Sequence, residues 1–161
     1  VFSTRKIKYS KKDYKNGFKL KLSSVLRNPT SMMTYLKALS YNENLYEYNK
    51  ANKEGFNEVV FLNIYGNIAE GATSNIFIIK DKKIYTPKIS DGILPGVVRN
   101  WVIKNFRVCE KHLDKEDLYS ADEVFITNSI LGIMKIVQFE ERSYSTSMVE
   151  RIRSEYEQFI I

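Results

Sequence analysis

Glu70 stands where a strand-like stretch of the sequence is interrupted. Apolar residues alternate through GNIAEGATSNIFII (residues 66–79) as they do in β-strands, but Gly71 and Ala72 directly follow the carboxylate. A glycine inside a strand pattern is typical of a bulge or of a close approach to the backbone. We therefore expect another group to approach the chain at Glu70, although an exposed charge on a strand would show the same pattern.

A second chemical feature is the stretch GILPGVVR (residues 92–99). Pro95 stands where the first residue of a helix is expected, and apolar residues follow it at helical intervals. The backbone N–H groups at Gly96, Val97 and Val98 would then be free of helical partners, and together with the helix dipole they can bind an anion such as a phosphate. Every helix has such an end, so this motif alone is a weak indication.

Two further candidates cannot be distinguished from ordinary surface residues by spacing alone. Thr127, Asn128 and Ser129 are small hydrogen-bonding residues at the end of a predicted strand, where a polar turn is common. Lys37 lies among leucines, as many surface lysines do. Taken singly, neither candidate predicts a function.

The composition fits one globular domain without a metal centre. The chain has 161 residues, 43% of them hydrophobic, and its single cysteine and histidine, Cys109 and His112, argue against an internal disulfide and a zinc site. It has no apolar run of about 18 residues and no apolar leader, so we expect a cytoplasmic protein without a membrane partner. The net charge of +6 permits an anionic partner. No nucleic-acid recognition motif accompanies that charge, so we expect a solvated lysine-rich surface.

Around these residues the sequence predicts an α+β fold rather than a parallel doubly wound sheet. Strands are predicted at 18–24, 58–63, 67–71, 74–80 and 83–87, of which the last four form an antiparallel meander. Further strands are predicted at 106–110 and 122–129, with 132–145 closing the sheet. Helices are predicted at 35–55 with Gly55 as the stop, from Pro95 onward, at 113–121 behind an Asp114 cap, and at 145–160.

Four blocks, taken in their order, resemble one known family. They are LKALSYNEN (36–44), the stretch 55–87 from GFNEVV to KIYTP, GILPGVVR (92–99) and ADEVFITNSILGI (121–133). In order and spacing they resemble the fold-type IV pyridoxal-phosphate enzymes, which include branched-chain and D-amino-acid aminotransferases and 4-amino-4-deoxychorismate lyase. The resemblance implies the α+β, pseudobarrel-like carboxyl-terminal domain of the D-amino-acid aminotransferase-like enzymes. It also implies pyridoxal 5′-phosphate as cofactor, a small-molecule substrate and a homodimer of the full-length enzyme.

The resemblance gives Lys37 and Glu70 the central roles. Lys37 would be the catalytic lysine, which forms a Schiff base with the cofactor and then moves the α-proton of the substrate. Glu70 would face the pyridine nitrogen and keep the ring protonated, so that the ring can accept electrons. This would explain the carboxylate inside the strand pattern, and Gly71 and Ala72 would be small because the cofactor passes close to the backbone.

The resemblance also implies the remaining contacts to the cofactor and the substrate. Many relatives have threonine where this chain has Val98, and valine cannot supply that hydroxyl to a phosphate. The implied contacts are Leu94 on the ring face, Tyr41 at the phenolic oxygen, Gly96, Val97, Val98 and Ser129 at the phosphate, and the backbone of Ile130 and Leu131 at the substrate carboxylate.

Family members are two-domain enzymes, and the match implies only one of those domains in this chain. Residues 1–30 would be a connecting segment and strand, and residues 31–161 the cofactor-binding carboxyl-terminal domain. An amino-terminal domain of about 100 residues is expected to be absent. In the family that domain supplies an arginine that binds the phosphate, and it also forms one wall of the substrate pocket. The chain alone is therefore expected to be inactive.

The sequence leaves the type of reaction open. TNSILGI (127–133) and the short stretch after Lys37 resemble the lyase branch. They favour 4-amino-4-deoxychorismate lyase, a β-elimination that gives 4-aminobenzoate and pyruvate in folate biosynthesis. The alternatives are a class IV aminotransferase for D-amino or branched-chain amino acids, a truncated and catalytically incomplete domain and, with less support, a basic nucleic-acid binder.

Overall fold

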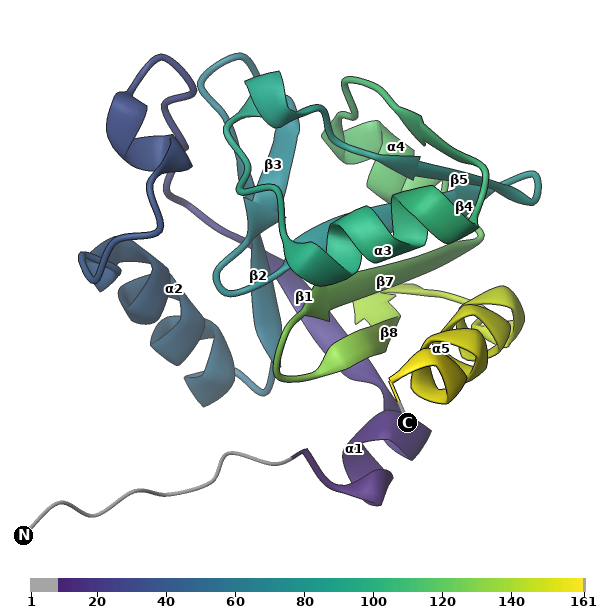
Figure 1. Ribbon diagram of the computed structural model, residues 1–161. Helices are drawn as coiled ribbons and strands as arrows, with labels where there is room; N and C mark the ends of the chain where they lie inside the picture. Colours follow the sequence, from purple (N-terminus) through teal and green to yellow (C-terminus); the bar gives the residue numbers. More distant parts are fainter. Residues whose placement is uncertain (1–8, 161) are drawn as a thin grey trace, which may run out of the picture.

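One mixed β-sheet organises the chain in the computed structural model, which describes residues 9–160 (Figure 1). Its strands lie in the spatial order β3-β2-β1-β8-β7-β4-β5-β6, and β9 pairs with β8. β1 runs parallel to both β2 and β8, and β5 runs parallel to β6, whereas the other pairs are antiparallel. The strands are β1 (Phe18–Leu22), β2 (Glu58–Leu62), β3 (Ile68–Gly71), β4 (Asn75–Lys80), β5 (Lys83–Thr86), β6 (Val108–Glu110), β7 (Glu123–Asn128), β8 (Gly132–Phe139) and β9 (Arg142–Ser143).

Helices pack on this sheet, and the mixture confirms the predicted α+β class. The helices are α1 (Lys11–Asn16), α2 (Asn42–Lys53), α3 (Val97–Asn105), α4 (Lys115–Tyr119) and α5 (Ser147–Phe159), with short 3-10 helices η1 (Met32–Tyr35) and η2 (Ile89–Asp91). α3 packs on β7, α5 packs on β7 and β8, and α2 packs on β2 (Figure 1). Within residues 9–160, no helix has the length and apolar character needed to cross a membrane.

The predicted four-strand meander is wrong. β2 pairs with β3 and β4 pairs with β5, but β1, β8 and β7 lie between these two hairpins. The edge of β4 that the meander would pair with β3 is instead paired with β7, in an antiparallel register from Asn75↔Thr127 to Ile79↔Glu123 that sets apolar residues of the two strands opposite each other. The expectation that residues 132–145 close the sheet is also wrong, because β8 lies inside the sheet between β1 and β7.

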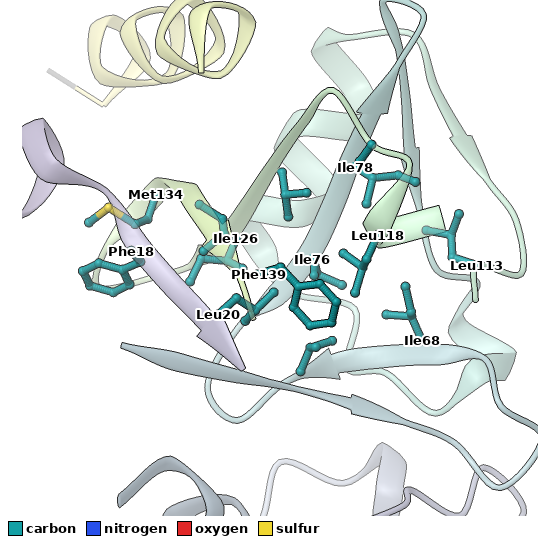
Figure 2. Packing of buried hydrophobic residues seen from close by; sticks show 14 of the residues in the cluster. Phe18, Leu20, Ile68, Ile76, Ile78, Leu113, Leu118, Ile126, Met134 and Phe139 are labelled. Atoms are coloured by element: carbon teal, nitrogen blue, oxygen red, sulfur yellow. The ribbon is translucent and has the colours of Figure 1, made fainter. Parts of the chain in front are cut away.

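The sheet separates two main apolar cores, and a third, smaller apolar cluster of Ala51, Val59, Phe61 and Ala72 lies between α2 and β2. Figure 2 shows the inner core, where side chains from β1, β3, β4, β7 and β8 meet Leu113 and Leu118 of the α4 region. On the opposite face, the rings of Phe77 and Phe125 stack with centroids 4.7 Å apart and pack with residues of α3 and α5. Because successive side chains of a strand alternate between faces, every second residue of β4 and β7 points toward α3.

The predicted helix over 35–55 is wrong in its first third. The chain forms η1, then an extended backbone at Leu36 (φ −96°, ψ 128°), and α2 begins only at Asn42. The leucines whose spacing suggested a buried helical face are instead exposed, namely Leu36, Leu39 and Leu45.

Hydrogen bonds and a small apolar cluster, rather than leucines, hold α2 on the sheet: Ala51 packs with Val59 and Phe61 of β2. The buried positions of α2 are Asn44, Glu47 and Ala51. The Glu47 carboxylate accepts hydrogen bonds from Ser23 Oγ over 2.9 Å and from the Ser24 N–H over 3.0 Å.

The remaining helix predictions are closer to the structure. α4 begins behind the predicted Asp114 cap, whose carboxylate accepts a hydrogen bond from the Asp117 N–H over 2.9 Å. α5 lies within the predicted range 145–160. α3 begins two residues after Pro95, with Gly96 as its N-cap. α1 was not predicted.

Candidate active site

Four segments that are distant in sequence, together with Tyr9 before α1, line one cavity of about 940 Å³. They are the residues before and within α2, the loop from β3 to β4, the approach to α3, and the end of β7 with its following turn. Leu131 does not line it, because this residue is 3% exposed and packs in the inner core. The other site residues predicted from the sequence all line the cavity: Lys37, Tyr41, Glu70, Leu94, Gly96, Val97, Val98, Ser129 and Ile130.

Glu70 places a buried carboxylate in the cavity wall. It lies in β3 with 7% of its surface exposed, and its Oε2 accepts a hydrogen bond from the Leu94 N–H over 3.0 Å. Burial raises the pKa of Glu70 to about 7, against the lowering effects of the Leu94 N–H and of the charges on Arg27 and Lys37. Within the described residues no donor contacts Oε1, so a cationic group in the cavity can pair with the carboxylate there.

Asn75 is a site residue that the sequence patterns did not reveal. Its Nδ2 donates to the Leu94 carbonyl over 2.7 Å and approaches Glu70 Oε2 at 3.5 Å. Its Oδ1 lies so close to Gly96 that a β-carbon at that position would collide with it. The one signal in the sequence was a polar residue at the start of an otherwise apolar strand, since buried amides need hydrogen-bond partners. Asn75 thus ties Glu70 to the approach to α3.

Lys37 reaches the cavity from the irregular segment before α2, at a tight turn in which the Ala38 N–H donates to the Leu36 carbonyl over 2.9 Å. Its Nζ lies 5.3 Å from the centroid of the Tyr41 ring, within the range of a cation–π interaction. The Tyr35 hydroxyl donates to the Pro29 carbonyl over 2.9 Å and anchors the preceding turn. Lys37 is exposed, so its amine is accessible, and its charge acts on Glu70 from across the cavity.

A second buried carboxylate, Glu58 of β2, fixes the loop between β3 and β4. Glu58 is 2% exposed and accepts hydrogen bonds from the Ala72 N–H over 3.2 Å, Thr73 Oγ1 over 3.0 Å and Ser74 Oγ over 3.0 Å. A β-carbon at Gly71 would collide with Ser74. The tight course of this loop therefore explains why a glycine follows Glu70.

The N-terminus of α3 forms another part of the wall. The Gly96 N–H is already used, because it donates to the Leu94 carbonyl over 2.9 Å. The N–H groups of Val97 and Val98 lie in the first helical turn and have no helical acceptor. Together with the positive end of the helix dipole they suit an anion.

The turn after β7 contributes Ser129 and Ile130 to the cavity. The backbone N–H groups of Ile130 and Leu131 both donate to Asn128 Oδ1, each over 2.9 Å. A substrate carboxylate would have to compete with the Asn128 side chain for these donors. Their role in substrate binding therefore stays a prediction.

Comparison with known proteins places this arrangement in a family. The family described as Amino-transferase class IV matches residues 1–139 of the chain. This chain belongs to the class IV aminotransferase family. Its pseudobarrel-like fold, predicted above, is confirmed by a solved structure of an aminotransferase from Brucella abortus bound to the co-factor PLP. That structure matches this chain with a TM-score of 0.82 and 30% sequence identity. The match covers 89% of this chain and 54% of the Brucella abortus chain.

Curated relatives of this class IV aminotransferase chain have two kinds of name. A probable branched-chain-amino-acid aminotransferase from Aquifex aeolicus (strain VF5) is 31% identical over 155 residues, which cover 91% of this chain and 50% of the relative. An aminodeoxychorismate lyase from Bacillus subtilis (strain 168) is 35% identical over 135 residues, which cover 81% of this chain and 46% of the relative. The chain spans about half the length of these relatives.

Proposed function

We propose that this chain is the pyridoxal-phosphate-binding part of a class IV enzyme in which Lys37 and Glu70 act at opposite ends of the cofactor ring. One observation carries the proposal: both residues line one cavity with the N-terminus of α3, although they lie on different elements. The Brucella abortus aminotransferase of the same fold, whose structure contains PLP, supports this choice of cofactor.

The polar groups of the cavity fit the parts of this cofactor. An accessible amine at Lys37 suits an aldehyde, the buried Glu70 carboxylate suits a pyridine nitrogen, and the N–H groups at the start of α3 suit a phosphate. When bound, pyridoxal phosphate supplies an electron sink for the bond that breaks beside the substrate nitrogen.

Each residue then has a definite task. Glu70 would hold a proton on the ring nitrogen, because a positive charge beside a carboxyl group with a pKa of about 7 favours its ionised form. Lys37 would remove a proton from the carbon that bears the substrate amino group. Leu94 would contact the ring, and its backbone is fixed by Glu70 and Asn75.

Within the family we propose 4-amino-4-deoxychorismate lyase activity in folate biosynthesis. The sequence TNSILGI (127–133) and the 35% identity with the Bacillus subtilis lyase support it. In this β-elimination Lys37 would take the proton from the ring carbon that bears the amino group, and the enolpyruvyl oxygen would leave the neighbouring ring carbon with the electrons of the C–O bond. The ring becomes aromatic and is released as 4-aminobenzoate, and the enolpyruvate takes up a proton on carbon to become pyruvate.

The second candidate is a class IV aminotransferase for branched-chain or D-amino acids. The Aquifex aeolicus relative favours it, since that match covers 91% of this chain. In this reaction Lys37 would return the proton at a different carbon, so Lys37 and Glu70 serve both candidates and do not distinguish them. That the full-length enzyme is a cytoplasmic homodimer with an additional amino-terminal domain stays a prediction from the resemblance.

Product analysis separates these functions. The full-length protein is incubated with pyridoxal phosphate and 4-amino-4-deoxychorismate, and in parallel with D-alanine or branched-chain amino acids plus a 2-oxo acid, with Lys37→Ala as control. Release of 4-aminobenzoate that depends on Lys37 is the expected result. Amino-group transfer without aminobenzoate supports the second candidate, and bound cofactor without turnover indicates a catalytically incomplete domain. Absence of cofactor binding contradicts the proposal.

A further inference from the structure

Thr127 carries a hydroxyl that the proposed function does not yet use. The residue is 1% exposed and lies at the end of β7 in the wall of the cavity. Its Oγ1 has no hydrogen-bond partner among residues 9–160. A buried hydroxyl without a partner is unfavourable, because it has lost its hydrogen bonds to water without replacing them. Such a group points to a ligand atom that completes its hydrogen bonding.

The register of the sheet places this hydroxyl beside the N-terminus of α3. Thr127 is paired directly with Asn75 of β4, and directly paired residues point to the same face of a sheet. That face carries the stacked Phe77 and Phe125, which pack with residues of α3. Asn75 in turn contacts Gly96, the N-cap of α3. The unpartnered hydroxyl and the free helical N–H groups are therefore independent features that converge on one place.

We infer that Thr127 is a ligand of a phosphate group bound at the start of α3, where its hydroxyl replaces the one that Val98 lacks. The identity of that phosphate as part of pyridoxal phosphate rests on the function proposed above. A threonine hydroxyl donates one hydrogen bond to a phosphate oxygen, whereas the buried valine side chain donates none. The sheet and the helix would thus hold the phosphate with donors from both.

Equilibrium binding of pyridoxal phosphate, pyridoxal and inorganic phosphate tests this inference. Thr127→Val keeps the shape and removes the hydroxyl, Thr127→Ser keeps the hydroxyl as the matched control, and Thr127→Val with Val98→Thr moves the hydroxyl to the helix. Loss of a hydrogen bond to a charged group predicts at least about tenfold weaker binding of pyridoxal phosphate by Thr127→Val. Binding of pyridoxal should not change, and the Ser variant and the double variant should bind pyridoxal phosphate nearly as the wild type does.

A second readout needs no cofactor. Ligand-free Thr127→Val should melt at a higher temperature than the wild type, because an unpartnered buried hydroxyl is gone. Inorganic phosphate should raise the melting temperature of the wild type more than that of the variant. If Thr127→Val does not fold, Thr127→Ala provides a second variant without the hydroxyl.

The outcomes separate this inference from the proposed function. Equal affinity of the wild type and Thr127→Val for pyridoxal phosphate overturns the inference and leaves the cofactor assignment intact. If the wild type binds no pyridoxal phosphate but phosphate stabilises it and not the variant, the cofactor assignment fails and Thr127 remains a phosphate ligand. If neither phosphate compound affects the wild type, the inference is overturned.

Discussion

The backbone N–H of Leu94 donates to Glu70 Oε2 over 3.0 Å, and this bond joins β3 to the approach to α3. Asn75 contacts both residues, through the carbonyl of Leu94 and the same carboxylate oxygen of Glu70. The orientation of the buried carboxylate and the position of the helix start are therefore set by shared contacts. Changes at these three residues should show in both the titration of Glu70 and the stability of the fold.

Glu70→Gln should make the ligand-free protein less sensitive to pH. In the wild type, burial raises the pKa of Glu70 from 4.5 to about 7. The unfolded chain therefore releases this proton at lower pH than the folded protein, and Glu70 lowers stability as the pH rises from about 4.5 to 7. At 1.36 kcal/mol per pKa unit this loss is on the order of 3 kcal/mol, complete above pH 7. The glutamine keeps an oxygen for the Leu94 N–H and does not titrate.

Urea unfolding at pH 4.5 and pH 8 measures this difference. The free energy of unfolding of Glu70→Gln, relative to that of the wild type, should be higher at pH 8 than at pH 4.5. Glu141→Gln, which changes an exposed glutamate in the turn between β8 and β9, is the control and should show no such trend. A relative stability that does not vary with pH would show that the Glu70 carboxyl is not desolvated as the structure indicates.

Arg27→Met should raise the pKa of Glu70 further. The Arg27 guanidinium lies 4.3 Å from the centroid of the Phe61 ring, and its charge lowers the pKa of Glu70. Without that charge the carboxyl group should hold its proton to a pH above about 7. An NMR titration of the Glu70 carboxyl carbon measures the midpoint directly, and Arg27→Lys should keep it near the wild-type value. A midpoint that is unchanged or lower in Arg27→Met would exclude this electrostatic contact.

Asn75 and Gly96 should be coupled energetically. Asn75→Ala removes the hydrogen bonds to Leu94 and Glu70 and should cost about 1–3 kcal/mol of stability. Gly96→Ala should cost about 1–3 kcal/mol by overpacking, because its β-carbon would collide with the Asn75 side chain. The double variant has room for that carbon, so its loss should be smaller than the sum of the single losses, as a double-mutant cycle of urea unfolding would measure. Strict additivity would contradict the contact.

Local patterns in the sequence predicted where helices and strands lie better than they predicted which strands pair in the sheet. The strands around Glu70 and the Asp114 cap depend on residues close in sequence, so alternation and cap chemistry were sufficient to place them. The pairing of β1 with β2 and β8 joins segments far apart in the chain, and no local pattern encodes which strand lies beside which.

The site residues show the same difference between features that depend on nearby residues and features that depend on segments far apart in the chain. Spacing alone made Lys37 a surface lysine on a helix, and only the resemblance to a family connected it with Glu70. The structure places both residues at one cavity but puts Lys37 in a tight turn before α2 rather than on a helix. Asn75 and the hydroxyl of Thr127 stand out only because both side chains are buried, which the sequence alone does not show. Burial at the end of a strand depends on the helix packed over it, here α3, which lies far from Thr127 in sequence.

Chemical trapping of the cofactor tests the central claim most directly, namely that Lys37 is the lysine that bonds to pyridoxal phosphate in the cavity that it shares with Glu70. The wild type, Lys37→Ala and Glu70→Gln are incubated with pyridoxal phosphate and reduced with borohydride, and the modified lysine is mapped by mass spectrometry. The label should lie on Lys37 in the wild type and in Glu70→Gln, and should be lost in Lys37→Ala. A label spread over other lysines of the wild type, or an undiminished label in Lys37→Ala, would contradict the account.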